Sequence, residues 1–203
     1  MKNIQFVILT LIAFAKPSFC QEPEIELLNG VFNAQLEFLT SETEKYADSS
    51  TYVKKLNLIY KSLKANQQQD IKENSLKYTF YKKYIINQIP LENILYVVER
   101  LNFGFQVAII YKTDDLLIHK KVFMDKVNGK WQLISPVKEK PLDVFPYLES
   151  FESRLSFACD YFSFSPNSFI SITRLNDDGY KSIILPLGCV NVKELKEVNS
   201  AFF

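Results

Sequence analysis

The segment from Asn93 to Ser135 constrains the fold more than any other part of the chain, because its pattern is typical of four consecutive β-strands. The strands are expected where Val, Ile, Phe and Tyr are concentrated, at residues 94–101, 103–112, 116–126 and 130–135. The dipeptide Asn128-Gly129 separates the last two strands and favours a two-residue hairpin, since both positions tolerate positive φ. We therefore expect an antiparallel meander whose register is fixed by this hairpin.

Two amphipathic helices are predicted before the meander. The first begins at Pro23, and its apolar residues recur at three- and four-residue spacing: Ile25, Leu28, Phe32, Leu36 and Leu39. The second is capped by Ser49 or Ser50, and its apolar stripe lies opposite a lysine-rich face. The stripe consists of Tyr52, Val53, Leu56, Ile59, Tyr60 and Leu63. Residues 75–89 fit either a helix or a strand, and we favour a helix.

The remainder of the chain, residues 141–203, is expected to add a second hairpin. Its two strands are predicted at residues 169–174 and 180–185, on either side of the turn sequence Asn-Asp-Asp-Gly. A short helix is expected within residues 148–162, although part of that stretch could be extended, and a last helical turn within residues 192–198. Pro-Val-Lys-Glu-Lys-Pro at 136–141 is the predicted boundary.

Helices that precede an antiparallel sheet define an α+β fold. The order of these elements, together with the final hairpin Val-Asn-Gly-Lys-Trp-Gln-Leu at 127–133, resembles the NTF2-like superfamily over about residues 24–135. The resemblance implies a cone in which helices cover a curved sheet, formed by a main body at 21–140, with 141–203 packed on the same domain as an extension. That superfamily contains enzymes with an Asp or His inside the cone and proteins that only bind ligands or other proteins. The resemblance alone therefore does not choose between these functions.

The first twenty residues have the pattern of a secretory signal peptide. A positively charged start precedes an apolar run from Ile4 to Ala15, which is too short to cross a bilayer core that needs about 20 residues. Cleavage is expected after Cys20, with cleavage after Ala15 as an alternative. We therefore expect a secreted or periplasmic protein without a membrane span. A lipid anchor at Cys20 on the outer surface, or an uncleaved anchor, is the alternative.

Two cysteines, Cys159 and Cys189, remain after cleavage at Cys20. Because exported proteins meet an oxidising compartment, we expect these two to form a disulfide. Such a bridge would stabilise the fold by roughly 3–4 kcal/mol in the chain-entropy model. The alternative is that both are buried thiols that pack as small apolar side chains.

Composition excludes several classes of function. The chain has 24 Lys and Arg against 23 Asp and Glu, so it lacks the basic excess of a nucleic-acid-binding protein. Its hydrophobic fraction of 47% is too high for a disordered chain. One His and three Cys are too few for a zinc cluster, and we expect no metal or other cofactor. The acidic doublets Asp114-Asp115 and Asp177-Asp178 are expected to stabilise turns and not to bind a metal.

His119 is the one side chain with an unperturbed pKa near neutral pH, so any histidine-based general acid or base has to be this residue. Strand alternation places it opposite Ile118, Val122 and Met124, which form the expected core face. We therefore expect His119 at the surface or rim of the fold, without a catalytic role. If the protein is an enzyme, His119 is the candidate.

Aromatic residues are unusually frequent, with 17 Phe, 11 Tyr and 1 Trp. Five tyrosines are predicted near the junction of helix and sheet and are candidates for lining a ligand pocket: Tyr78, Tyr81, Tyr84, Tyr96 and Tyr111. The sequence thus predicts an exported protein that acts by binding, either an apolar or amphipathic small molecule or another envelope protein. The alternative is an exported NTF2-like isomerase, lyase or hydrolase that uses His119 as general base. A structural accessory or inhibitor of a secreted protein is the third possibility.

Overall fold

The computed structural model describes residues 22–46, 50–72, 75–101, 104–114, 116–127, 130–134, 137–142, 168–189, 196 and 203. The expected signal peptide, the Asn-Gly turn at 128–129, the short helix within 148–162 and Cys159 lie outside these residues. So does nearly all of the last turn expected within 192–198.

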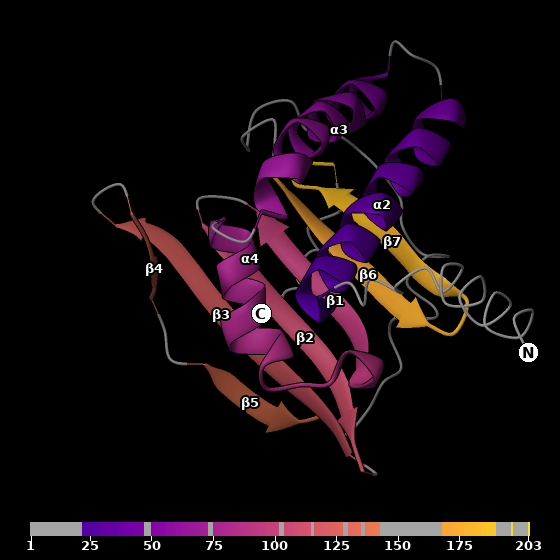
Figure 1. Cartoon of the computed structure of the whole chain (residues 1–203). Coiled ribbons are helices and arrows are strands. Elements are labelled where there is room, and N and C mark those ends of the chain that lie inside the picture. Colours follow the sequence, from indigo (N-terminus) through magenta and orange to yellow (C-terminus); the bar gives the residue numbers. More distant parts are fainter. Residues whose placement is uncertain are drawn as a thin grey trace, which may run out of the picture.

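Seven strands form one curved antiparallel sheet, in the order β4-β3-β2-β1-β6-β7 (Figure 1). Strand β5 lies off this path and pairs with the same edge of β3 as β4 does. The strands are β1 (Ile94–Leu101), β2 (Phe105–Thr113), β3 (Leu116–Val127), β4 (Lys130–Leu133), β5 (Lys138–Pro141), β6 (Phe169–Asn176) and β7 (Gly179–Pro186). Antiparallel pairing of β1 to β4 in chain order confirms the predicted meander.

The C-terminal hairpin β6–β7 continues this sheet. Val98 in the middle of β1 pairs with Ala108 on β2 and with Ile172 on β6, so β1 is an interior strand. Gly179 starts β7 with a φ of 111°, a backbone conformation that glycine adopts readily. Residues 138–141, within the stretch where the sequence suggested a boundary, form β5 along the edge of β3. The hairpin is therefore part of the same sheet as the main body, and nothing in the described residues separates the two.

Three α-helices pack on the sheet: α2 (Pro23–Glu44), α3 (Thr51–Asp70) and α4 (Leu76–Tyr81) (Figure 1). Ser50 caps α3 by accepting a hydrogen bond from the backbone N–H of Val53 at 3.1 Å, and Ser75 caps α4 in the same way. A π-helical turn η1 (Lys82–Ile86) extends α4, and a 3₁₀ turn η2 (Leu91–Asn93) leads into β1. These elements confirm the helix favoured within 75–89. None of the helices in the described part of the chain combines the length and apolar character of a membrane span.

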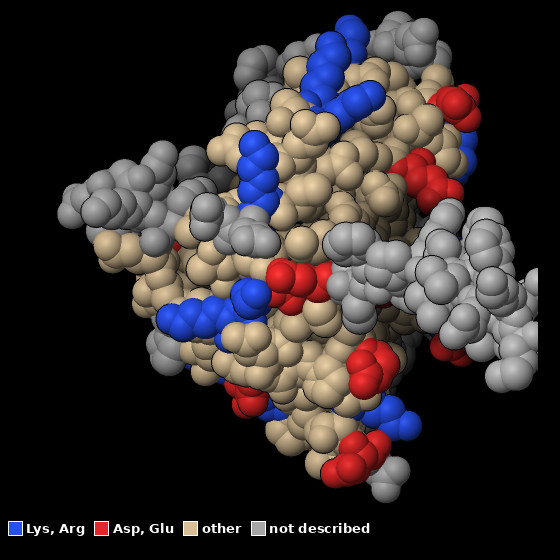
Figure 2. Space-filling model, in the orientation of Figure 1, with Lys and Arg blue, Asp and Glu red and all other residues tan. Residues whose placement is uncertain are grey.

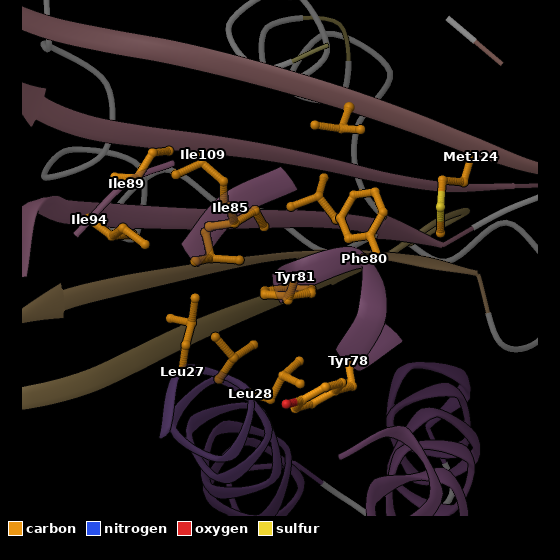
Figure 3. Close-up of a cluster of buried hydrophobic side chains, with 14 residues drawn as sticks. Leu27, Leu28, Tyr78, Phe80, Tyr81, Ile85, Ile89, Ile94, Ile109 and Met124 are labelled. Atoms are coloured by element: carbon orange, nitrogen blue, oxygen red, sulfur yellow. The ribbon is translucent and has the colours of Figure 1, made fainter. Parts of the chain in front are cut away.

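The principal core lies between the helices and the sheet (Figure 3). Leu27, Leu28 and Val31 of α2 meet Tyr81 and Ile85, which come from α4 and η1, above apolar residues of β1, β2 and β3. A neighbouring cluster joins α2 and α3 to the C-terminal hairpin through side chains that include Phe32, Leu56, Phe169 and Ile184. The helices are therefore fixed by burial of their apolar stripes, as the sequence periodicity predicted.

The opposite face of the sheet is also buried. Tyr96, Val98, Ala108, Ile110, Ile170, Ile172, Ile183, Leu185 and Leu187 form a separate apolar cluster on that face. Phe203 packs against this cluster and accepts a hydrogen bond from Lys121 through its main-chain oxygen. Both faces of the sheet therefore exclude water over β1, β2 and β6. A polar residue on either face cannot for that reason be taken as exposed to solvent.

Candidate functional site

A cavity of about 450 Å³ lies between α3, α4 and the sheet. Its apolar wall is formed by Leu63, Leu101, Phe105, Met124 and Phe169. Its polar lining consists of Ser62, Asn66, Gln69, Asp70, Ser75, Lys77 and Glu99, and Leu76 completes it. A concave site of this size that combines an apolar wall with a few polar groups is typical of small-molecule binding.

Glu99 on β1 is the most deeply buried charged group of this site, with 2% of its surface exposed. It points toward the helices because it shares that face of the strand with Val97 and Leu101. Its carboxylate accepts hydrogen bonds from Tyr81 Oη at 2.5 Å and from Gln35 Nε2 at 2.8 Å. Residues from α2 and α4 thus converge on one strand residue.

Lys77 on α4 forms an ion pair with this carboxylate, with its Nζ 2.8 Å from Glu99 Oε1. Lys77 and Tyr81 lie four residues apart, so both side chains project from the same face of α4 and reach the same acceptor. The ammonium also lies 4.2 Å from the centroid of the Phe32 ring and 5.4 Å from that of Phe105. Lys77 is therefore held in place by a charge partner and by aromatic faces.

These contacts determine the ionisation of Glu99. Burial alone would raise its pKa, but the charge of Lys77 and the hydrogen bonds from Lys77, Tyr81 and Gln35 outweigh burial and hold the pKa of Glu99 below its ordinary value. The same environment raises the pKa of Tyr81 well above its ordinary value, through burial first and the charge of Glu99 second. Glu99 is thus an ionised acceptor and Tyr81 a neutral donor at neutral pH.

Gln35 extends the network across the sheet. Its Nε2 donates to Ser171 Oγ at 2.7 Å as well as to Glu99, and these two acceptors are register partners on β1 and β6. Gln35 is fully buried, and within the described residues its Oε1 accepts no hydrogen bond. The amide therefore joins α2 to the neighbouring strands β1 and β6 beside the cavity.

Asp70 is the third ionisable residue that lines the cavity, at the last position of α3. Its main-chain oxygen accepts a hydrogen bond from Ser75 Oγ at 2.5 Å, whereas its carboxylate has no hydrogen bond or ion pair to any residue that the structure describes. Burial raises the pKa of Asp70, the charge of Glu99 raises it further, and Lys77 opposes both. The cavity thus contains one compensated ion pair and one additional carboxyl group.

Four of the five tyrosines that the sequence proposed as pocket-lining residues lie at one core on the helix side of the sheet, and the fifth does not. Tyr78, Tyr81 and Tyr84 come from α4 and η1 on the helix side, and Tyr111 packs against the same core. None of these four lines the 450 Å³ cavity, although Tyr81 supports it through its bond to Glu99. Tyr96 lies on the opposite face of the sheet. A direct ligand contact from these tyrosines stays a prediction.

Tyr78 has a structural role instead. Its single hydroxyl proton is shared between two acceptors, Glu24 Oε1 at 2.9 Å and Glu22, and its oxygen accepts a hydrogen bond from Lys82 Nζ at 2.9 Å. Lys82 also forms an ion pair with Glu24 at 2.6 Å. Burial, followed by the hydrogen bond to Glu22, raises the pKa of Tyr78 to about 12. This group ties the start of α2 to α4, on the side of the helices away from the cavity lining.

The predicted exposure of His119 is wrong: only 5% of its surface is accessible. The sequence correctly assigned it to the face opposite Val122 and Met124, but that face is buried too. His119 pairs in register with Ile110, a member of the apolar cluster on that face, and with Lys140 on β5. Because the cavity lies on the helix side, His119 is separated from it by the sheet.

The remaining candidate residues are placed as follows. Asp114 has a φ of 46° in the turn after β2, and Asp177 and Asp178 form the turn between β6 and β7, which agrees with the turn roles expected for these three residues, whereas Asp115 lies outside the described residues. Within the described residues no group of three or more His, Cys, Asp or Glu side chains could hold a metal ion. Cys189 is fully buried, and its bridge to Cys159 stays a prediction.

A second cavity of about 400 Å³ lies near the starts of β1 and β3 and the end of β6. It is lined by Leu95, Tyr96, Leu117, Arg174, Leu175, Asn176 and Asp177. Tyr96 is the one predicted pocket residue in either cavity.

On the helix side of the molecule, basic side chains gather over α3 and charges of both signs are scattered elsewhere, without a field of one sign (Figure 2).

Asp70, Lys77 and Glu99 were not among the site residues predicted from the sequence. Glu99 could have been found, because an acidic residue stands between Val97 and Leu101 on a face that is otherwise apolar. Lys77 stands four residues before Tyr81, so the two side chains share one face of a helix. Once Glu99 was recognised as a buried carboxylate, Lys77 could have been predicted as its partner. No comparable sequence pattern marks Asp70, because its position at the cavity depends on where α3 ends relative to α4.

Comparison of the chain with protein-family models, with curated proteins and with solved structures found no match.

Proposed function

We propose that this chain is an exported binding protein that holds an amphipathic small molecule in the cavity between α3, α4 and the sheet. The observation that supports this proposal best is the division of the 450 Å³ cavity into an apolar wall and a polar end. An alkyl or ring portion of a ligand would contact Leu101, Met124 and Phe169. Its polar group would lie near Asp70 and Lys77. A site of this composition provides affinity through apolar burial and orientation through polar contacts.

The proposal favours binding over the enzymatic alternative with His119 as general base. A general base must reach the reacting atom within about 3 Å, directly or through one water. His119 lies on the other face of the sheet from the cavity and is buried there. A helix-covered curved sheet with a cavity between the two layers is also what the NTF2-like resemblance implies, and we retain that family as part of the proposal. Export rests on the N-terminal sequence and is proposed on that ground.

The test of this function is the binding of a neutral fluorescent amphiphile, N-phenyl-1-naphthylamine, to the purified mature chain. Ser62→Trp places a large side chain at the cavity wall, whereas Leu58→Trp changes an exposed residue one turn earlier on α3, with 43% of its surface accessible. We expect saturable binding at one site that Ser62→Trp weakens at least tenfold and Leu58→Trp leaves unchanged. Absence of saturable binding, or equal affinity of the two variants, would show that the cavity is not a ligand site.

A further inference from the structure

We propose that the ligand of this cavity carries a protonated amine, and that the Asp70 carboxylate is its counter-ion. This inference rests on the proposed function and specifies the polar group of the ligand. It follows from the charges that line the cavity and from how many of them already have partners.

The described residues that line the cavity include three ionisable side chains: Asp70, Lys77 and Glu99. Lys77 and Glu99 are in direct contact at 2.8 Å, and Glu99 accepts further hydrogen bonds from Tyr81 and Gln35. This pair is therefore electrically compensated, and its carboxylate is supplied with donors from two helices. Asp70 is the charge that remains, so the described part of the cavity lining is negative by one unit when Asp70 is ionised.

Asp70 lines the cavity half-buried, next to the negative Glu99, and no described residue donates a hydrogen bond to its carboxylate. Partial burial raises its pKa, which means that the ionised form is disfavoured. Charged groups that are kept in clefts at a cost in stability are typical of functional sites. A ligand that brings a positive charge and N–H donors would remove this cost.

The alternatives to a cationic group fit less well. An anionic group would enter beside two carboxylates, and the one ammonium in the lining is already paired with Glu99 at 2.8 Å. Burial of an unpaired charge is strongly unfavourable. A neutral group such as a hydroxyl could donate one hydrogen bond to Asp70, but it would leave the negative charge uncompensated. The apolar wall, which includes Leu101, Met124 and Phe169, is suited to the aliphatic or aromatic part of an amine.

The experiment compares three probes that share a chain and differ in the head group: octylammonium, octanol and octanoate. Binding to the mature chain is measured by calorimetry at neutral pH, with Asp70→Asn as the test variant and Asp178→Asn as the matched control. Asp178 lies in the exposed turn between β6 and β7, away from the cavity. We expect octylammonium to bind at least tenfold more tightly than octanol, and octanoate to bind most weakly.

Asp70→Asn should weaken octylammonium binding at least tenfold and leave octanol binding unchanged, while Asp178→Asn should change neither. The thermal midpoint of Asp70→Asn reports whether the variant is folded, and we expect it to equal or exceed that of the wild type. If octanol binds and Ser62→Trp blocks it, but octylammonium has no advantage, the amine assignment is overturned and the cavity function stands. If none of the probes binds, both are overturned.

Discussion

The ring of Tyr180 on β7 lies directly against the backbone of Gly30 in the middle of α2. A Cβ atom at position 30 would lie 2.4 Å from Tyr180 Cζ and 2.5 Å from both Cε atoms, well inside van der Waals contact. The absence of a side chain at Gly30 therefore sets how closely α2 approaches the C-terminal hairpin. The contact joins the first helix to a strand at the opposite end of the chain.

Gly30→Ala should destabilise the fold by about 1–3 kcal/mol, because the Tyr180 ring has to leave its position. At an unhindered helical site the same change would stabilise the fold by up to about 1 kcal/mol. The sign of the change in the free energy of unfolding therefore distinguishes a hindered site from an unhindered one. Urea unfolding measures the effect. In a Tyr180→Ala background the added methyl group has room, and Gly30→Ala should then be neutral or stabilising. A stabilising effect in the wild-type background would contradict the close approach.

Lys77→Met should destabilise the fold by about 3–5 kcal/mol, since it leaves the Glu99 carboxylate buried without its charge partner. Lys77→Met combined with Glu99→Gln removes both charges and should be less destabilised than Lys77→Met alone. Lys61→Met, at an exposed position of α3, is the control and should change the free energy of unfolding by no more than about 0.5 kcal/mol. Equal stability of Lys77→Met and Lys61→Met would argue against a structural ion pair.

Stability should fall in acid through Glu99. Its folded pKa lies below its ordinary value of 4.5, so the unfolded chain binds this proton first and the contribution of Glu99 to folding is complete above pH 4.5. The contribution is lost as the pH falls through the lower, folded pKa. Asp70 has a raised pKa and acts in the opposite direction, because protonation relieves its penalty. Urea unfolding below pH 4.5 should therefore show a weaker decline for Glu99→Gln than for the wild type, and parallel curves would exclude this linkage.

Glu139→Ala should loosen strand β5 and destabilise the fold by about 1–3 kcal/mol. Its partner Lys120 is 1% exposed, with Nζ 2.7 Å from Glu139 Oε1 and a second bond to Gln88. Loss of the carboxylate leaves a buried ammonium with one described partner. Hydrogen exchange at the amides of β5 should accelerate, whereas Glu92→Ala, at an exposed position, should leave it unchanged. Unchanged exchange in Glu139→Ala would mean that the pair does not hold β5.

The proposed export predicts a chain that begins at Gln21 and contains no free thiol. Mass analysis of the secreted protein gives the N-terminus, and thiol titration under denaturing, non-reducing conditions counts the sulfhydryl groups. Two free thiols would exclude the Cys159–Cys189 bridge. A lipid-modified Cys20 would assign the protein to a membrane surface.

The local parts of the fold could be predicted from the sequence, and the long-range pairing could not. Apolar spacing located α2 and α3, the serine pair 49–50 marked the start of α3, and alternation located the meander, because each of these depends on neighbours within a few residues. The pairing of Val98 with Ile172 depends on which distant strand reaches the free edge of β1. No local pattern encodes that choice, and the C-terminal hairpin was therefore expected to be an extension of the main body.

The error at His119 has the same origin. Alternation placed it on the correct side of β3, but its exposure depends on whether that side is covered, and the apolar cluster on that side is contacted by Leu142 and Phe203, which are distant in sequence from each other. The candidate site was missed for a related reason. Asp70 and Lys77 belong to different helices, and their approach to Glu99 is a property of the assembled layers.

The central place of β1 has a consequence for synthesis. As the chain emerges from the ribosome, β1 can pair with β2 at once, while its other edge has to wait for residues 169–176. An incomplete chain thus presents an apolar strand with open hydrogen-bonding groups, the kind of edge that recruits other chains. A nascent form kept extended until its last strands are available would avoid self-association, and folding after translocation would supply that delay.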